Sequence, residues 1–199
     1  MLRTTSTLLC AILVLISAAA SAQAPTTMRV RGTITAIDGN IVSVKSRDGK
    51  DLKLELTDKT VVATAKAITL ADLKPGDSVG ETSMRNADGR LTARAVHTIP
   101  PTVAEGHGPW DLLPDSLMTN ARLVTAVKAV GSHELTVEYK DGSQKFLVPD
   151  GTPIVTTITA DRTALKVGEY VFFGGTVGAD GKLTTGRIQV SKDGIRPPQ

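Results

Sequence analysis

The chain has 199 residues, of which 41% are hydrophobic and only 3% aromatic, and its formal net charge is +3. The 23 basic and 20 acidic residues are interspersed and form no polybasic block, so the net charge by itself does not indicate whether nucleic acid or an anionic membrane is a partner. Cys10 is the only cysteine, so the chain cannot form an internal disulfide.

Residues 1–22 are predicted to be a secretory signal peptide. Arg3 supplies the positive charge, an apolar run extends from Leu8 to about Ser17, and small residues follow up to Ala22. The run is shorter than the roughly 20 residues of a membrane-spanning helix, and no later segment comes close. We therefore expect a periplasmic or secreted protein that begins near Gln23 and has no membrane span after removal of the signal.

The rest of the sequence contains an internal repeat with an offset of 92 residues. LKPGDSV at 73–79 matches LKVGEYV at 165–171, and ADGRLT at 87–92 matches ADGKLT at 179–184. The matched blocks keep their order, so residues 28–98 and 119–191 are predicted to be two copies of one unit. Residues 99–118 form a linker between them, and residues 192–199 form a C-terminal tail.

Each copy has the pattern of short antiparallel strands. In DLKLEL at 51–56 and ELTVEY at 134–139 apolar and polar residues alternate, as in strands with one buried face. Leu54 in the first copy, and Phe146 or Val148 in the second, are predicted core positions. Thr69 is expected to cap a single helical turn before Pro75, and DRTALKVGE at 161–169 repeats this turn.

This order of elements predicts an all-β fold of two tandem small barrels joined by a Pro-rich linker. Three strands, a helical turn and two or three further strands are typical of a five- to six-stranded Greek-key barrel of the oligonucleotide/oligosaccharide-binding type, here called OB-like. A single β-sandwich made from both copies is the alternative, because repeated strands can also pair across the copies.

Three segments resemble a known family. VRGTITAIDGN at 30–40, LADLKPGDSV at 70–79 and ADGRLTARAVH at 87–97 are similar to the bacterial secreted β-barrel family called domain of unknown function 5666. The second copy follows the same outline more loosely, so the resemblance covers nearly the whole chain after the signal. It implies an exported β-barrel protein, and the family offers no catalytic residues.

The linker segment EGHGPWDLLPDS at 105–116 contains the only tryptophan of the chain. A tryptophan between two small barrels most often fills the crevice where they meet. We therefore interpret the segment as a clasp whose apolar contacts are Trp110, Leu112 and Leu113, and we take the crevice between the barrels as the candidate binding site.

A metal site is the alternative interpretation of the same region. Imidazole and carboxylate groups are ligands of zinc, copper and nickel, and four of them lie within fifteen residues. They are His97, Glu105, His107 and Asp111. Glycines flank His107 and Pro109 follows, so these residues lie in a loop and not on one face of a helix. This interpretation would make the chain a periplasmic metal-binding protein associated with a transport system.

We recognise no catalytic signature in the sequence. A G-x-S-x-G elbow, an H-E-x-x-H helix and a glycine-rich phosphate loop are all missing, and the first copy contains no aromatic residue on which a nucleic-acid base could stack. The sequence therefore predicts a non-catalytic binding or interaction module of the bacterial cell envelope. Its partner is either an envelope protein or a small ligand, with no cofactor and no nucleic acid.

Overall fold

The computed structural model describes residues 26–129 and 132–198, and the predicted signal peptide at 1–22 lies outside these residues. The first copy contains a 3₁₀ turn, η1 (Leu70–Asp72), and six strands. They are β1 (Thr26–Asp38), β2 (Ile41–Ser46), β3 (Asp51–Glu55), β4 (Val61–Ala67), β5 (Ser78–Arg85) and β6 (Leu91–Thr98).

The second copy repeats this order after a short linker strand, β7 (Gly106–Pro109). Its elements are β8 (Leu117–Ala129), β9 (Ser132–Tyr139), β10 (Gly142–Pro149), β11 (Ile154–Ala160), η2 (Arg162–Ala164), β12 (Tyr170–Val177), β13 (Leu183–Thr184) and β14 (Arg187–Val190). At the offset of 92 residues, β13 and β14 together correspond to β6. The prediction of an all-β fold is confirmed, and no helix among the described residues is long and apolar enough to cross a membrane.

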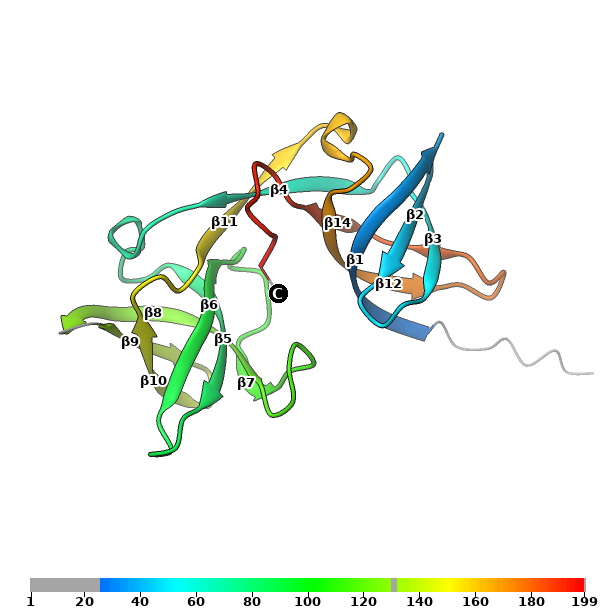
Figure 1. Cartoon of the computed structure of the whole chain (residues 1–199). Helices are drawn as coiled ribbons and strands as arrows, with labels where there is room; N and C mark the ends of the chain where they lie inside the picture. Colours follow the sequence, from blue (N-terminus) through cyan, green and yellow to red (C-terminus); the bar gives the residue numbers. More distant parts are fainter. Residues whose placement is uncertain (1–25, 130–131, 199) are drawn as a thin grey trace, which may run out of the picture.

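The two copies exchange strands. One five-stranded ring, the first barrel, consists of β1, β2 and β3 from the first copy and β12 and β13 from the second. It closes through antiparallel pairing of β1 with β12, in which Val30 lies opposite Phe173, and through parallel pairing of β3 with β13, in which Leu54 lies opposite Leu183. In Figure 1 the blue and cyan strands of this barrel accordingly lie beside the orange ones.

The second barrel is built in the reciprocal way. It combines β8, β9 and β10 of the second copy with β5 and β6 of the first. Parallel pairing of β10 with β6 places Phe146 opposite Leu91, and β5 pairs with β8 in antiparallel fashion. Both rings therefore have the strand order predicted for an OB-like barrel, but each takes its last two strands from the other copy.

Two arm strands carry the chain from one barrel to the other (Figure 1). β4 and β11 pair with each other in antiparallel fashion, with Thr64 opposite Ile158 at the middle. β4 also pairs with β14, and β11 with β6. Because an arm held in this way stays extended, the chain cannot turn back to the three strands that precede it, and the last two strands dock on the other barrel.

The prediction that residues 28–98 and 119–191 each close a barrel of their own is therefore wrong. The alternative, a single sandwich, correctly anticipated pairing across the copies, but the buried apolar residues form two separate cores. Each core contains side chains from both copies, such as Leu54 and Phe173 in the first barrel and Leu91 and Phe146 in the second. The predicted core positions Leu54, Phe146 and Val148 are confirmed, with exposures of 0%, 0% and 1%.

The predicted helical turns are also confirmed. Thr69 precedes η1, and the Asp72 carboxylate accepts hydrogen bonds from the Thr69 N–H and hydroxyl, both at 2.8 Å. After each turn an apolar residue enters a core: Leu73 joins the core of the second barrel, and Leu165 joins that of the first. The turn η1 of the first copy therefore packs on the second barrel, together with β5 and β6. The turn η2 of the second copy packs on the first barrel, together with β12 and β13.

Candidate functional site

The linker joins the second barrel before it reaches the first. β7 pairs with β8 along the side of the second barrel. A tight turn follows from Trp110 to Ser116. The backbone N–H of Trp110 donates to the Ser116 carbonyl at 2.8 Å, and the backbone N–H of Leu113 donates to Ser116 Oγ at 3.1 Å. The buried Ser116 hydroxyl thus fixes the shape of the turn, and the turn carries Trp110 and Asp111 toward the first barrel.

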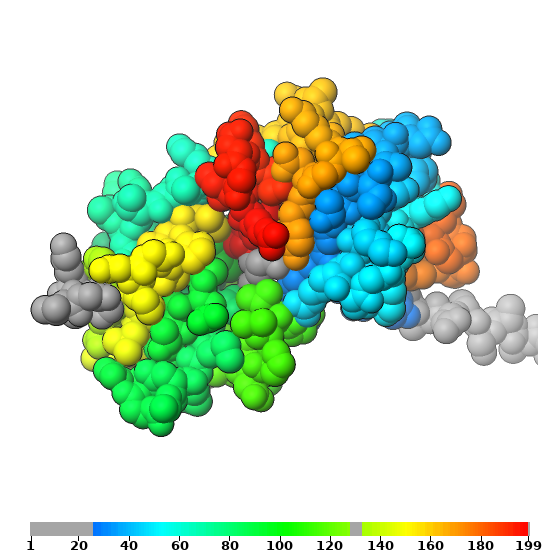
Figure 2. Space-filling view, in the orientation of Figure 1, coloured from blue at the N-terminus to red at the C-terminus, as the bar shows by residue number. Residues whose placement is uncertain are grey.

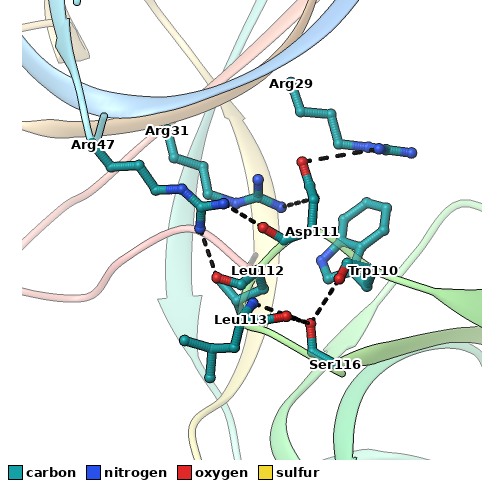
Figure 3. Close-up of polar contacts among 8 residues, drawn as sticks. All are labelled: Arg29, Arg31, Arg47, Trp110, Asp111, Leu112, Leu113 and Ser116. Carbon is teal, nitrogen blue, oxygen red and sulfur yellow. Dashed lines mark hydrogen bonds and ion pairs between the residues drawn. The ribbon is translucent and has the colours of Figure 1, made fainter. Parts of the chain in front are cut away.

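Arginines of the first barrel hold this turn (Figure 3). Arg31, whose side chain is 2% exposed, donates from Nη2 to Asp111 Oδ1 at 2.9 Å. Arg47 donates to the carbonyl of Leu112 at 2.7 Å and to that of Asp111. Partial burial acts to raise the pKa of Asp111, but the hydrogen bond from Arg31 and the charges of Arg31 and Arg29 outweigh it and hold the pKa below 3.8.

The Trp110 ring is half-buried beside the same arginines. The guanidinium carbon of Arg29 lies 4.3 Å from the ring centroid, and that of Arg31 lies 5.5 Å from it. Arg31 also lies 4.8 Å from the ring centroid of Phe172 on β12. Cation–π contacts of this kind, together with the Arg31–Asp111 pair, attach the linker to the first barrel.

Leu112 and Leu113 have different surroundings from Trp110. Leu112 is half-buried and lines a hollow described below, whereas Leu113 is 40% exposed. The expectation that Leu113 is an apolar contact of the clasp is therefore wrong. Its place in the turn explains this, because its backbone is bonded to Ser116 while its side chain points outward (Figure 3).

The four candidate metal ligands do not come together. Glu105 accepts a hydrogen bond from Arg122 at 3.0 Å, His107 Nδ1 lies 2.8 Å from the Thr119 hydroxyl, and Asp111 is paired with Arg31. His97 is buried on β6. Within residues 26–129 and 132–198 no group of three or more His, Cys, Asp and Glu side chains is placed to hold a metal ion. The metal site that the spacing suggested is therefore not formed.

A cavity of about 220 Å³ lies where the linker and the two barrels meet. Its walls are mainly apolar, with contributions from Ile99, Val103, Trp110, Met118, Phe172 and Pro198. Arg187 on β14 is the charged residue of its described lining at pH 7. The larger polar residues are His97 on β6 and Gln189 on β14. The cavity is thus made by the outer faces of both barrels, with the linker and the C-terminal tail as further walls.

The repeat explains how the two barrel faces differ. At the offset of 92 residues, Gly80 corresponds to Phe172, and His97 corresponds to Gln189. Gly80 lies opposite His97, and Phe172 lies opposite Gln189, in the two equivalent strand pairs. A Cβ atom at Gly80 would lie only 2.3 Å from His97 Nε2, so the missing side chain at Gly80 makes room for the His97 ring.

Two residues of the cavity lining each carry a polar atom that is buried without a hydrogen-bond partner among the described residues: His97 Nδ1 and Trp110 Nε1. Burial lowers the pKa of His97 to about 4, so its imidazole is neutral at pH 7. Nearly all buried polar groups in native proteins are satisfied, so each exception calls for an explanation, such as a bound water or ion. Two such atoms belong to residues that line this one cavity.

A larger hollow of about 600 Å³ lies next to the cavity. Ala67 and Val155 of the arm strands line it, together with Leu112 and the tail residues 194–198. Pro198 lines both spaces, so the tail separates them. Figure 2 shows the tail, in red, between the yellow and green surface of the second barrel and the blue surface of the first.

Sequence reasoning identified Trp110 but missed Phe172, Arg187 and Gln189 as cavity residues. The repeat contained a usable signal, because directly after the matched block LKPGDSV the first copy has Gly80 where the second copy has the large side chain of Phe172. Comparisons of the chain with known protein families, with curated proteins and with solved structures found no match. The assignment of a function therefore depends on the geometry of this site.

Proposed function

We propose that the protein is an exported, non-catalytic binding module of the cell envelope, and that it binds a small molecule in the cavity between the two barrels. The observation that carries the proposal is the pairing of apolar walls with the unpartnered His97 Nδ1 and Trp110 Nε1. Ligand sites typically combine an apolar lining with a few well-placed polar groups, and they occur preferentially between domains.

A small ligand fits these observations better than an envelope protein does. The linker, the tail and both barrels all contribute to the walls of the cavity, and a space of about 220 Å³ admits a small molecule but not a folded domain. Its volume exceeds the roughly 150 Å³ of an engineered apolar cavity that takes up benzene. A single ring or a short chain with one polar end therefore matches the space.

The test is a thermal-shift screen of the processed chain with compounds of this size. A ligand that binds only the folded chain stabilises it by RT ln(1 + [L]/Kd), about 2.7 kcal/mol at a hundredfold excess over Kd. Val103→Phe should abolish the shift because Val103 lies at the partly exposed rim of the cavity. Val127→Phe, at an exposed position of β8, is the matched control and should leave it unchanged. Equal shifts in both variants would contradict the proposed site.

A further inference from the structure

The charges around the cavity restrict the chemistry of its ligand. Arg187 lines the cavity, and no Asp or Glu is among the described lining residues. Arg187 donates from Nη2 to the Thr157 hydroxyl at 2.9 Å, which anchors the guanidinium between β14 and β11. A guanidinium has five N–H donors in a rigid fork, so the group retains donors after making this bond. The cavity therefore offers a positive charge that no lining carboxylate neutralises.

The indole of Trp110 adds to this preference for an anion. Its Nε1 is a donor only and has no partner among the described residues. His97 is neutral, so its unpartnered Nδ1 donates or accepts according to the tautomer and does not decide the charge of the ligand. Arg31 lies against both Trp110 and Phe172, but its charge is paired with Asp111, so Arg187 supplies the uncompensated charge. The polar part of the site thus combines the Arg187 fork with the indole N–H.

We infer that the cavity binds a small apolar carboxylate, such as a single-ring aromatic acid, and this inference rests on the function proposed above. The carboxylate would accept hydrogen bonds from Arg187, because the guanidinium fork matches the two oxygens of a carboxylate. The apolar body would pack against Phe172, Trp110 and Met118. A free phosphate fits less well, because it has no apolar body to place against these walls.

The test compares benzoate with benzamide, its neutral counterpart of nearly the same shape. Calorimetric titration of the processed chain should give about tenfold or more tighter binding for benzoate, since a hydrogen bond to a charged group contributes more than a neutral one. Arg187→Gln should remove this preference while retaining the binding of benzamide. Arg90→Gln, at an exposed arginine that pairs with Asp88 in the turn between β5 and β6, is the matched control and should retain the preference.

Arg187→Lys provides a second variant if the glutamine variant does not fold. It keeps the charge and loses the fork, so the preference for benzoate should shrink without vanishing. Equal affinities for benzoate and benzamide in the unmodified chain would overturn the carboxylate inference and leave the proposed cavity function intact. A failure of benzoate, benzamide, phenylacetate and short fatty acids to bind at millimolar concentrations would overturn both.

Discussion

Arg31 and Asp111 are 80 residues apart in the chain and are joined by a hydrogen bond of 2.9 Å. Arg31 belongs to the first barrel, whereas Asp111 belongs to a linker that β7 attaches to the second. The Arg31 side chain is 2% exposed, and Asp111 is 45% exposed. A nearly buried charge thus depends on one partly exposed carboxylate, which makes the pair a sensitive point of the assembly.

Replacing Asp111 with asparagine should lower the free energy of unfolding by about 1–3 kcal/mol, because Arg31 would keep an acceptor but lose its counter-charge. Urea denaturation at neutral pH measures the change. Asp58→Asn, at an exposed position between β3 and β4, is the control and should change stability by no more than about 0.5 kcal/mol. The pKa of Asp111 is lowered, so its contribution is present above pH 3.8 and is lost as the pH falls through the lower folded-state value.

For Glu81 we expect folding stability to depend on pH with the opposite sign. Its side chain is buried in the second barrel, at the position that corresponds to the core residue Phe173. Burial raises its pKa from 4.5 to about 9, and neither carboxylate oxygen has a hydrogen-bond partner among the described residues. The folded chain therefore keeps a proton that the unfolded chain loses, and its contribution to stability is full below pH 4.5 and falls as the pH rises toward 9.

Glu81→Gln should remove this slope. Each pKa unit of difference corresponds to about 1.4 kcal/mol, so the variant should become more stable than the unmodified chain by several kcal/mol in mildly alkaline solution. Denaturant melts at a series of pH values measure the difference, with Glu138→Gln, at an exposed position of β9, as the control. Parallel stability curves for the Glu81→Gln variant and the unmodified chain would show that Glu81 is not held protonated.

The strand exchange predicts that the two copies stay together after the linker is cut. Residues 101–105 are exposed, so a protease site introduced there should be cleaved in the native state. Because each barrel contains strands from both copies, the fragments should co-elute in size-exclusion chromatography and separate only in denaturant. Separation of two folded fragments under native conditions would contradict the exchange.

Gly80→Ala tests the packing of His97. The new Cβ would lie 2.3 Å from His97 Nε2 and 2.5 Å from Cε1, so the ring must move, and we expect a loss of about 1–3 kcal/mol together with weaker ligand binding. His97→Ala in the same chain should relieve the clash and recover part of the stability. The control, Gly174→Ala on β12, meets no neighbouring atom and should be nearly neutral in thermal melts.

The sequence predicted the strands and the buried positions but not which copy supplies the last strands of each barrel. Alternation in DLKLEL decides which side of β3 faces a core, and Leu54 is buried as expected. The strand that pairs with β3, however, depends on the direction in which the arm β4 carries the chain. Because the sequence is repeated, β6 of the first copy and β13 of the second are similar candidate partners. The choice depends on contacts between distant segments, such as the pairing of β4 with β11, that no local pattern encodes.

The candidate site was predictable only where one short segment determines it. Trp110 stood out because it is the only tryptophan and lies in the linker. Phe172 and Arg187 could not be recognised in this way, since each lies on the outer face of a strand and becomes part of a cavity only when the second barrel approaches. His97 was noticed, but for its ligand chemistry and not for its place in the cavity.

The exchange of strands also determines when the protein can fold. The first barrel cannot close until β12 and β13 have been synthesised. Its three N-terminal strands therefore lack two of their pairing partners until almost the whole chain has been made. Val30 and Phe173, which face each other in this barrel, are separated by most of the sequence, and such distant contacts slow folding because the chain must first close a long loop. The second barrel needs only residues up to β10, so we expect it to form first and to serve as the platform on which the two chain ends meet.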